Sequence, residues 1–303
     1  REGLRPFVQV SEPKPGVMDF IEKFEWMTGI LVNEAVCHRV AREAVEDAAA
    51  EGIDYIELRY SPWFMAQAHY LAPRAVVEAV TDGVRAAERA LDIKVNQIGI
   101  LSRHFGPEIA WQELECLLAS KYEFVGLDLA GDEAHFPGNL FVDHFKKARD
   151  AGWHITAHSG ESAGAQSIWQ AIDELGAERI GHAVRAVDDP ALLDALHERQ
   201  IGIECNLTSN VQTSTVSDYG SHPLKRFLAK GLLATLNTDD PGISAIDLHH
   251  EFETAAVLAG LDEHMIRQAQ HNALEIAFLS PSDKKELLRK KAHQGETPLS
   301  KNQ

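Results

Sequence analysis

Residues 154–161 read HITAHSGE, and segments of this kind alternate with helical patterns on both sides of it. The stretch begins as an alternating, partly apolar run, which is typical of a buried strand. It ends at His158, and Glu161 follows three positions later across a Ser-Gly pair. Either these polar residues merely end the strand and have no chemical role, or the strand brings a metal ligand and a proton carrier to one point.

Outward from this stretch, short apolar or β-branched runs with polar ends recur along the chain. We predict strands at residues 55–60, 94–102, 124–131, 153–161, 179–184, 201–210 and 232–242, each followed by a helical pattern. Strands that alternate with helices form one parallel sheet. Seven strands fit an open doubly wound sheet, whereas a (β/α)8 barrel needs eight.

The domain organisation follows from what lies between these strands. Two helices are predicted before the first strand, at residues 19–32 and 33–52. No linker rich in proline or glycine divides the chain, so we predict a single domain over residues 1–303. From about residue 283 the sequence becomes charged, which predicts a solvated last helix and a tail that runs to residue 303.

Composition excludes several classes of function. The net charge of −17 comes from 46 acidic and 29 basic residues, and such a surface repels the phosphates of nucleic acids. Cys37, Cys116 and Cys205 have no CxxC spacing, which favours a reducing, cytoplasmic location over a disulfide framework. No apolar run reaches membrane-spanning length, so we expect no membrane partner.

Polar or ionisable residues follow all seven predicted strands on the same side. In parallel α/β proteins the catalytic groups lie at this edge. Buried charges are costly there unless they are paired or bind a metal. The residues are Glu57, Arg59, Arg103, His104, Gly131, Asp132, Glu133, His158, Glu161, His182, Thr208, Ser209, Asn210, Asp239 and Asp240.

Four of these residues suggest a divalent metal site. His158 and Asp239 are the strong ligand candidates, with Glu161 and His182 as candidate bases. Nitrogen and oxygen ligands without a thiolate suit zinc or another first-row metal. A catalytic zinc needs at least three protein ligands and a water, so one or two ligands are missing from this set. The alternatives are a core histidine at His182 and a helix N-cap at the Asp239-Asp240 pair.

The ordinary signatures of other enzymes are absent from the sequence. There is no GxGxxG after the first strand, no GxxxxGK[ST], no HExxH and no GxSxG. The His-x-Glu and Pro-Cys-x-x-Cys signature of cytidine-type zinc deaminases is also absent. We expect Arg59 and Arg103 to tie loops together rather than to contact a substrate.

Six groups of segments together resemble the adenosine deaminase family, most closely its bacterial members. In chain order they are YIELRYSP at 55–62, LDLAGDE at 127–133, HITAHSGE at 154–161, ERIGHAV at 178–184, LTSN at 207–210 with QTSTV at 212–216 and HPL at 222–224, and NTDDPG at 237–242. The resemblance runs from about Leu31 to Ser280. It implies a (β/α)8 TIM barrel that hydrolyses adenosine, and deoxyadenosine, to the inosine product and ammonia in purine salvage.

The resemblance also implies a role for each site residue. His158 and Asp239 would bind one zinc ion per subunit, Glu161 and His182 would be catalytic, and Gly131 and Asp240 would bind the substrate. Glu161 would protonate N1 of the purine, and His182 would orient and deprotonate the water on the zinc. Ser159 and Ala183 replace an alanine and a glycine that are usual in the family, and neither change removes a ligand.

One part of the family pattern is not found. The family takes two further zinc ligands and a ribose-contacting aspartate from a His-x-His segment on its first strand, and no His-x-His occurs in this sequence. We therefore expect the first barrel strand to be missing from this chain, and expect the chain to be inactive if that truncation is real. Alternatives are a related aminohydrolase of adenine or a modified purine, and a catalytically dead barrel that acts as a binding protein. The oligomeric state stays open.

Overall fold

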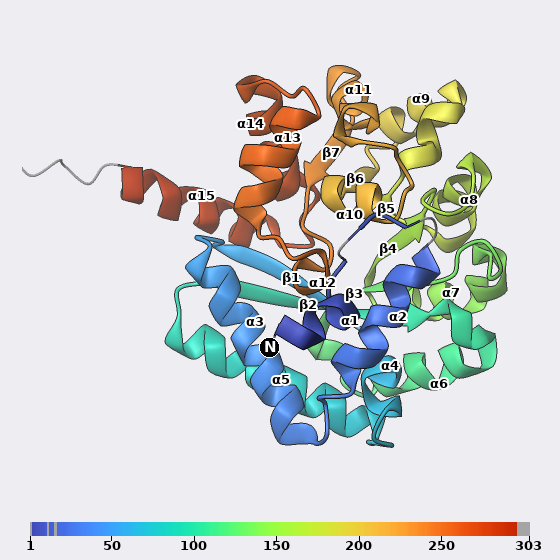
Figure 1. Cartoon of the computed structure of the whole chain (residues 1–303), viewed down its shortest axis with the longest axis vertical. Coiled ribbons are helices and arrows are strands. Elements are labelled where there is room, and N and C mark those ends of the chain that lie inside the picture. The colour runs from blue at the N-terminus through green and yellow to red at the C-terminus, as the bar shows by residue number, and fades with distance from the viewer. Residues whose placement is uncertain (1, 11, 15–16, 296–303) are drawn as a thin grey trace, which may run out of the picture.

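A computed structural model describes residues 2–10, 12–14 and 17–295. Its described part contains seven parallel strands that neighbour one another in chain order, and the sheet curls while helices cover its outside (Figure 1). The strands are β1 (Tyr55–Tyr60), β2 (Lys94–Ser102), β3 (Phe124–Ala130), β4 (His154–Ser159), β5 (Arg179–His182), β6 (Gly202–Cys205) and β7 (Leu233–Leu236). The predicted parallel alternation is therefore confirmed.

Helices connect the strands and line the outside of the sheet. The longer ones are α2 (Val17–Thr28), α3 (Glu34–Ala50), α5 (Pro73–Ala90), α6 (Gly106–Leu118), α7 (Val142–Asp150), α9 (Pro190–Glu198), α14 (Glu263–Ile276) and α15 (Pro281–Gly295). The short α-helices are α1 (Arg5–Val8), α4 (Pro62–Gln67), α8 (Ala165–Gln170), α10 (Leu207–Gln212), α11 (Leu224–Ala229), α12 (Pro241–Ser244) and α13 (Ala256–Leu258). Two π-helical segments, η5 (Ala171–Leu175) and η8 (His250–Ala255), continue α8 and precede α13. Single 3-10 turns are η1 (Glu2–Leu4), η2 (Arg103–Phe105), η3 (Lys121–Glu123), η4 (Gly138–Phe141), η6 (Val184–Asp188) and η7 (Tyr219–Ser221).

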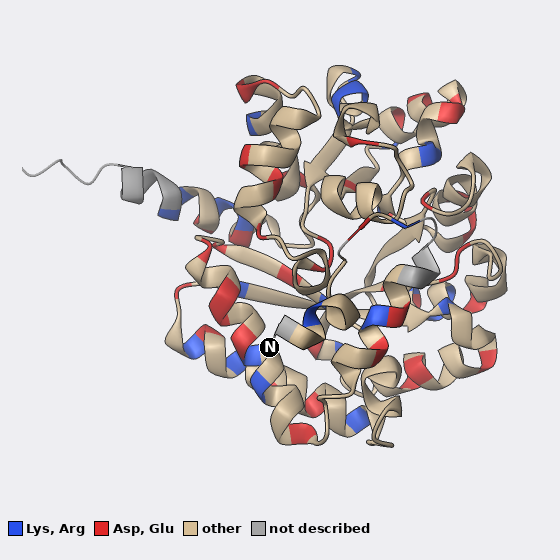
Figure 2. Cartoon of the chain, in the orientation of Figure 1, with Lys and Arg blue, Asp and Glu red and all other residues tan. Residues whose placement is uncertain are grey.

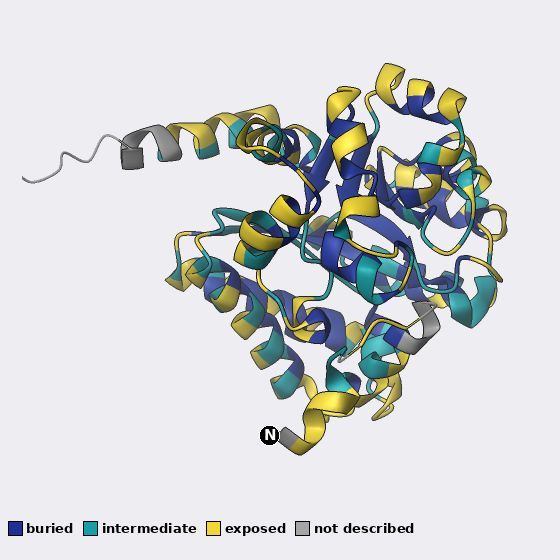
Figure 3. Ribbon diagram, turned by 45° about the horizontal axis from the view of Figure 1, so that its top comes forward, coloured by how far each residue is buried: buried dark blue, intermediate teal, exposed yellow. Residues whose placement is uncertain are grey.

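The core lies between the sheet and these helices, as the buried strands in Figure 3 show. Leu127, Ile155, Ile180 and Ile203 of successive strands are fully buried. Strands covered on both faces in this way read as nearly continuous apolar runs, which is why the sequence pattern located them. β1 differs, because all six of its residues are only half-buried. Acidic residues lie on helices all around the barrel (Figure 2).

Ion pairs cross the interior of the curled sheet. The guanidinium of Arg59 on β1 lies 3.1 Å from Asp128 of β3 and 2.7 Å from Glu204 of β6. Arg179 of β5 pairs with the same Glu204 at 2.8 Å and with Glu57 of β1 at 2.6 Å. Strands that are far apart in the sheet order therefore face one another, as they do across a barrel.

Several predicted boundaries were wrong. The predicted strand at 201–210 ends at Cys205, and LTSN instead begins helix α10. The carboxylate of Glu251 accepts a hydrogen bond from the backbone N–H of Thr208, which stabilises the start of that helix. The predicted strand at 232–242 covers only Leu233–Leu236. The charged last helix begins at Pro281, and residues 296–303 of the predicted tail lie outside the described residues.

The amino-terminal segment lies beside the loops that follow β6 and β7. The backbone N–H of Val10 donates to the carbonyl of Ile243, and that of Lys14 donates to the carbonyl of Gln212. Ile243 belongs to α12 and Gln212 to α10, and both helices follow directly on strand ends. Across the described residues, none of the helices is both long and apolar enough to cross a membrane.

Candidate metal and catalytic site

His158 is fixed by a buried carboxylate. It lies at the end of β4, and its Nδ1 donates to Asp128 of β3 at 3.1 Å from Oδ1 and 3.0 Å from Oδ2. Asp128 is fully buried. Burial alone would lower the pKa of His158, but the charge and hydrogen bond of Asp128 raise it to about 9. A histidine whose Nδ1–H is held by a carboxylate presents Nε2 outward, which is the usual arrangement of a metal ligand.

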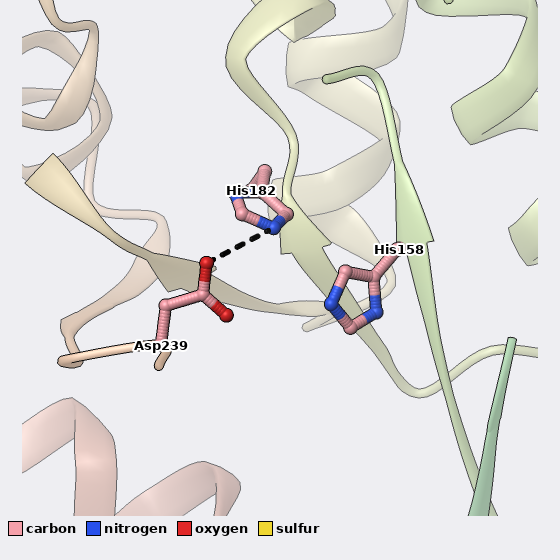
Figure 4. A group of neighbouring side chains, drawn as sticks. All are labelled: His158, His182 and Asp239. Atoms are coloured by element: carbon pink, nitrogen blue, oxygen red, sulfur yellow. Dashed lines mark ion pairs between the residues drawn. The ribbon is translucent and has the colours of Figure 1, made fainter. Parts of the chain in front are cut away.

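His182, at the end of the neighbouring strand β5, and Asp239, which follows β7, lie close to His158 (Figure 4). The potential ligand atoms of these three residues all lie within 4.8 Å of one another. Nε2 of His182 is 4.0 Å from Oδ2 of Asp239, and that oxygen also accepts a hydrogen bond of 2.7 Å from Ser209. The structure thus brings the two predicted ligands, His158 and Asp239, together with His182 beside them.

Backbone strain marks two residues of this cluster, His182 and Asp239. His182 has φ of 67° and Asp239 has φ of 59°, in the left-handed region that residues with side chains rarely adopt. Such strain costs of order 1–3 kcal/mol per residue and gathers at functional sites. His182 is the last residue of β5, and Asp239 lies in the segment that follows β7, so the left-handed backbone turns the chain beside the cluster at both positions.

Glu161 is buried beside the cluster. Its Oε2 lies 3.6 Å from Nε2 of His182, while Oε1 accepts hydrogen bonds from Asn210 at 3.4 Å and Thr213 at 3.3 Å. Burial raises the pKa of Glu161 above its ordinary value. A raised pKa favours the protonated carboxyl, and a protonated carboxyl can act as an acid.

The loop that carries Glu161 is held by a second carboxylate, Glu133. Its Oε2 accepts hydrogen bonds from the backbone N–H groups of Glu161 at 3.2 Å, Ser162 at 3.0 Å and Ala163 at 3.0 Å. Its Oε1 accepts from the N–H of Gly160. Glu133 is 4% exposed, so these charge-assisted bonds are shielded from water. The sequence placed Glu133 at a strand end but did not reveal this role.

Asp240 and Gly131 also lie at the predicted strand ends. Asp240 is the N-cap residue of α12, yet its side chain makes no capping hydrogen bond, which disfavours the N-cap interpretation. Burial, followed by the charge of neighbouring Asp239, strongly raises the pKa of Asp240. Gly131 has φ of 109°, and a Cβ there would lie 2.5 Å from Nδ1 of His104, so this position requires glycine.

The two arginines tie parts of the fold together, although Arg59 joins strands across the interior rather than the predicted loops. Arg103 is 1% exposed and donates to the backbone carbonyls of Leu129, Phe136 and His158. Arg59 pairs with Asp128, so the carboxylate that holds His158 is itself held by a cation. Sequence reasoning missed Asp128 and His222, and it gave Glu133 a place at a strand end but no role; all three lie inside segments of the family pattern.

The donor set fits a zinc ion. His158 and Asp239 offer a nitrogen and an oxygen, and His158 has the carboxylate behind it that zinc-binding histidines usually have. His182 offers a third atom in the same cluster. No thiolate lies in this group, so the site matches the nitrogen and oxygen sites of hydrolytic metals.

Comparison with known proteins decides the family, because a family model described as adenosine deaminase matches residues 1–293. The chain belongs to the adenosine deaminase family. The curated adenosine deaminase of Edwardsiella ictaluri is 56% identical over 286 residues, which are 94% of this chain and 86% of that protein. The family resemblance of the sequence is thereby confirmed.

Solved structures agree on the fold. The structure of an adenine deaminase from Arthrobacter aurescens has a TM-score of 0.90 at 25% identity and covers 98% of this chain and 89% of its own. An amidohydrolase from Burkholderia ambifaria, solved with bound zinc, has a TM-score of 0.87 at 24% identity. The match covers 97% of this chain and 82% of the amidohydrolase. These are (β/α)8 barrels, and the described residues supply seven parallel strands of such a barrel.

The activity follows from this family membership. The chain is a hydrolase that deaminates adenosine to inosine, in a metal-dependent family. The predicted fold, enzyme class and reaction are thus confirmed, whereas the role of each site residue stays a prediction.

Proposed function

We propose that this enzyme binds one zinc ion through His158 and Asp239 and deaminates deoxyadenosine as well as adenosine. Glu161 and His182 are the proposed catalytic groups, and Asp240 and the backbone at Gly131 bind the substrate. The observation that supports this best is the approach of His158, His182 and Asp239 to within 4.8 Å of one another. A location in the reducing cytoplasm fits the three cysteines, which are all free.

The reaction adds water to C6 of the purine and releases the 6-amino group as ammonia. Bound zinc would supply a Lewis acid that lets water act as a nucleophile near neutral pH. His182 orients that water, because its Nε2 faces the side chains of Glu161 and Asp239. Holding the water and the purine ring in one geometry removes much of the entropic part of the barrier.

Glu161 is the proposed acid. Burial favours its protonated form, and this form can donate a proton to N1 of the purine as the water oxygen bonds to C6. The proton that the water loses then returns to the Glu161 carboxylate, from which it can leave with the amino group as ammonia. Protonation at N1 neutralises the negative charge that the addition places on the ring. The carboxyl of Asp240, whose pKa is also strongly raised, is a second buried hydrogen-bonding group for the substrate.

The proposal is tested with Glu161→Gln, which keeps the shape of the side chain and removes the acid. We expect kcat for ammonia release from adenosine to fall by about 10²–10⁴-fold. The zinc content should stay the same, because Glu161 is not a proposed ligand. Glu178→Gln is the matched control, since Glu178 is an exposed carboxylate that pairs with His154 and accepts from the backbone N–H of Ile155 at the far end of β4. Full activity in Glu161→Gln would refute the proposed acid.

Adenine or a modified purine is the second candidate substrate. The fold is shared with the adenine deaminase of Arthrobacter aurescens at 25% identity, and the same metal cluster can serve either substrate. The ratio of kcat/KM for adenosine to that for adenine separates the two. A ratio well above one supports the nucleoside, and a ratio below one would reverse the assignment.

A further inference from the structure

A line of hydrogen bonds leads from the protein backbone to His182. The backbone N–H of Leu224 donates to Nδ1 of His222 at 3.1 Å, and Nε2 of His222 lies 3.1 Å from Oδ1 of Asn210. Nδ2 of Asn210 lies 2.9 Å from Nδ1 of His182. The residues Asn210, His182 and His222 are 0%, 1% and 3% exposed, so water does not compete for these contacts.

The first contact fixes the direction of every later one. A backbone N–H can only donate, so Nδ1 of His222 must carry a lone pair. A neutral imidazole has one N–H, which for His222 is therefore at Nε2, directed at Oδ1 of Asn210. The amide nitrogen of Asn210 then faces His182, whose Nδ1 must be the acceptor. The proton of a neutral His182 consequently sits on Nε2.

The opposite direction does not satisfy the same atoms. If the amide of Asn210 were turned over, its nitrogen would face Nε2 of His222, and the proton of His222 would have to move to Nδ1. That proton would then oppose the N–H of Leu224 across 3.1 Å, as two donors in a buried site. Burial lowers the pKa of His222 to about 3, which agrees with the neutral ring that the Leu224 contact requires.

Two neighbouring contacts agree with this direction. Nδ2 of Asn206 also lies 3.2 Å from Nδ1 of His182, so two amide groups donate to the same nitrogen. Nδ2 of Asn210 lies 3.4 Å from Oε1 of Glu161, which gives its second proton an acceptor. Each amide hydrogen of Asn210 therefore has a partner in only one orientation of the side chain.

We propose that Asn210 and His222 are positioning residues that hold His182 in its Nε2–H tautomer. This inference rests on the proposed function, in which His182 acts on the attacking water. In this tautomer His182 donates a hydrogen bond to the water and orients it, and the neutral ring has no lone pair at Nε2 with which to remove a proton. It differs in this respect from the deprotonating role that the family resemblance implied.

The tautomer also decides whether His182 can be a metal ligand. Nε2 is the atom through which His182 approaches Asp239, at 4.0 Å. A nitrogen that carries a proton cannot bind a metal. His182 is then a neighbour of the metal, and the ligands among the described residues are His158 and Asp239.

Nitrogen-15 NMR of histidine-labelled protein tests the proposal directly, because protonated and unprotonated ring nitrogens resonate far apart. The signals of His182 are assigned as those that vanish in His182→Gln. In the zinc-loaded and zinc-free enzyme, we expect an unprotonated Nδ1 and a protonated Nε2. A proton on Nδ1, or an Nε2 that loses its proton when zinc binds, overturns the proposal without any other variant.

Substitutions at two positions probe the chain of bonds itself. Asn210→Asp has the same shape but only accepts, so it should move the proton of His182 to Nδ1 and lower kcat at least tenfold. His222→Gln keeps an N–H donor toward Asn210, so it should restore the tautomer that His222→Leu loses. An unchanged tautomer in Asn210→Asp refutes the role of Asn210, and equal tautomers in the two His222 variants refute the role of His222.

The tautomer measurement does not depend on turnover. A failed Glu161→Gln experiment would therefore overturn the proposed acid and leave the tautomer result intact. A reversed tautomer in an enzyme that still requires Glu161 would overturn only the inference about Asn210 and His222.

Discussion

Asp128→Asn is the most informative substitution for the metal site. Asp128 is fully buried and accepts from Nδ1 of His158 and from the guanidinium of Arg59 at 3.1 Å. An asparagine keeps one acceptor oxygen, but its NH2 group must face one of these two donors. The substitution therefore loosens the orientation of His158 and leaves part of the charge of Arg59 unpaired.

Two quantities should change. Loss of a hydrogen-bonded partner behind a metal ligand typically weakens metal binding by about 10- to 100-fold, which corresponds to about 1.4–2.8 kcal/mol. Loss of a hydrogen bond to a buried charged group removes about 1.5–3 kcal/mol of unfolding free energy. Arg59 keeps Glu204 at 2.7 Å, so the loss of stability should stay within that range.

The assay is competition for zinc with a chelator of known affinity, together with urea unfolding of the zinc-free protein. Glu178→Gln is again the matched control, because it breaks a second histidine–carboxylate pair on the same strand, His154–Glu178 at 2.9 Å. Both side chains of that pair are about half exposed, so its removal should cost only about 0–1 kcal/mol. A zinc affinity within twofold of the wild type in Asp128→Asn would refute the reasoning.

Three further predictions concern residues around the site. Glu133→Gln has one acceptor oxygen fewer for the N–H groups of the loop that carries Glu161. Hydrogen exchange of residues 160–163 should therefore accelerate, and kcat should fall about tenfold or more. Unchanged exchange would contradict this prediction. Burial raises the pKa of Glu113 from 4.5 to about 7, so the native state binds the extra proton and unfolding free energy should fall by up to about 3 kcal/mol between pH 4.5 and 7. Urea unfolding across this range should show a smaller fall in Glu113→Gln, and an equal fall in both proteins would exclude Glu113 as the cause. Gly131→Ala should lower stability by about 1–3 kcal/mol because its φ of 109° and the ring of His104 both oppose a Cβ, and an unchanged melting temperature would show that His104 moves away at little cost.

The sequence located the parts of the site that follow a regular pattern. The strands of a parallel sheet are buried on both faces, so their apolar runs stand out, and the polar residues that end them are conspicuous. His158, His182 and Asp239 were found in this way. Their approach to one another follows from the parallel topology, because the carboxyl ends of all strands meet at one edge.

What could not be predicted depends on contacts between segments distant in the chain. Asp128 lies inside an apolar strand, and nothing in the letters LDLAGDE says that its side chain meets His158, 30 residues later. The sequence showed His222 only as part of the family segment HPL, because its role depends on the direction of one hydrogen bond. The start of α10 was missed because Glu251, which stabilises it, is 43 residues away.

The ion pairs across the interior have a consequence for how the protein is made. Arg59 acquires its second carboxylate, Glu204, only after 145 more residues have been synthesised. At about 5–20 residues per second, this takes roughly 7–30 s on the ribosome. During that time the nascent amino-terminal half carries a cation that its own residues only partly neutralise. The ion pairs of the barrel interior can therefore form completely only late in translation, after β6 has been made.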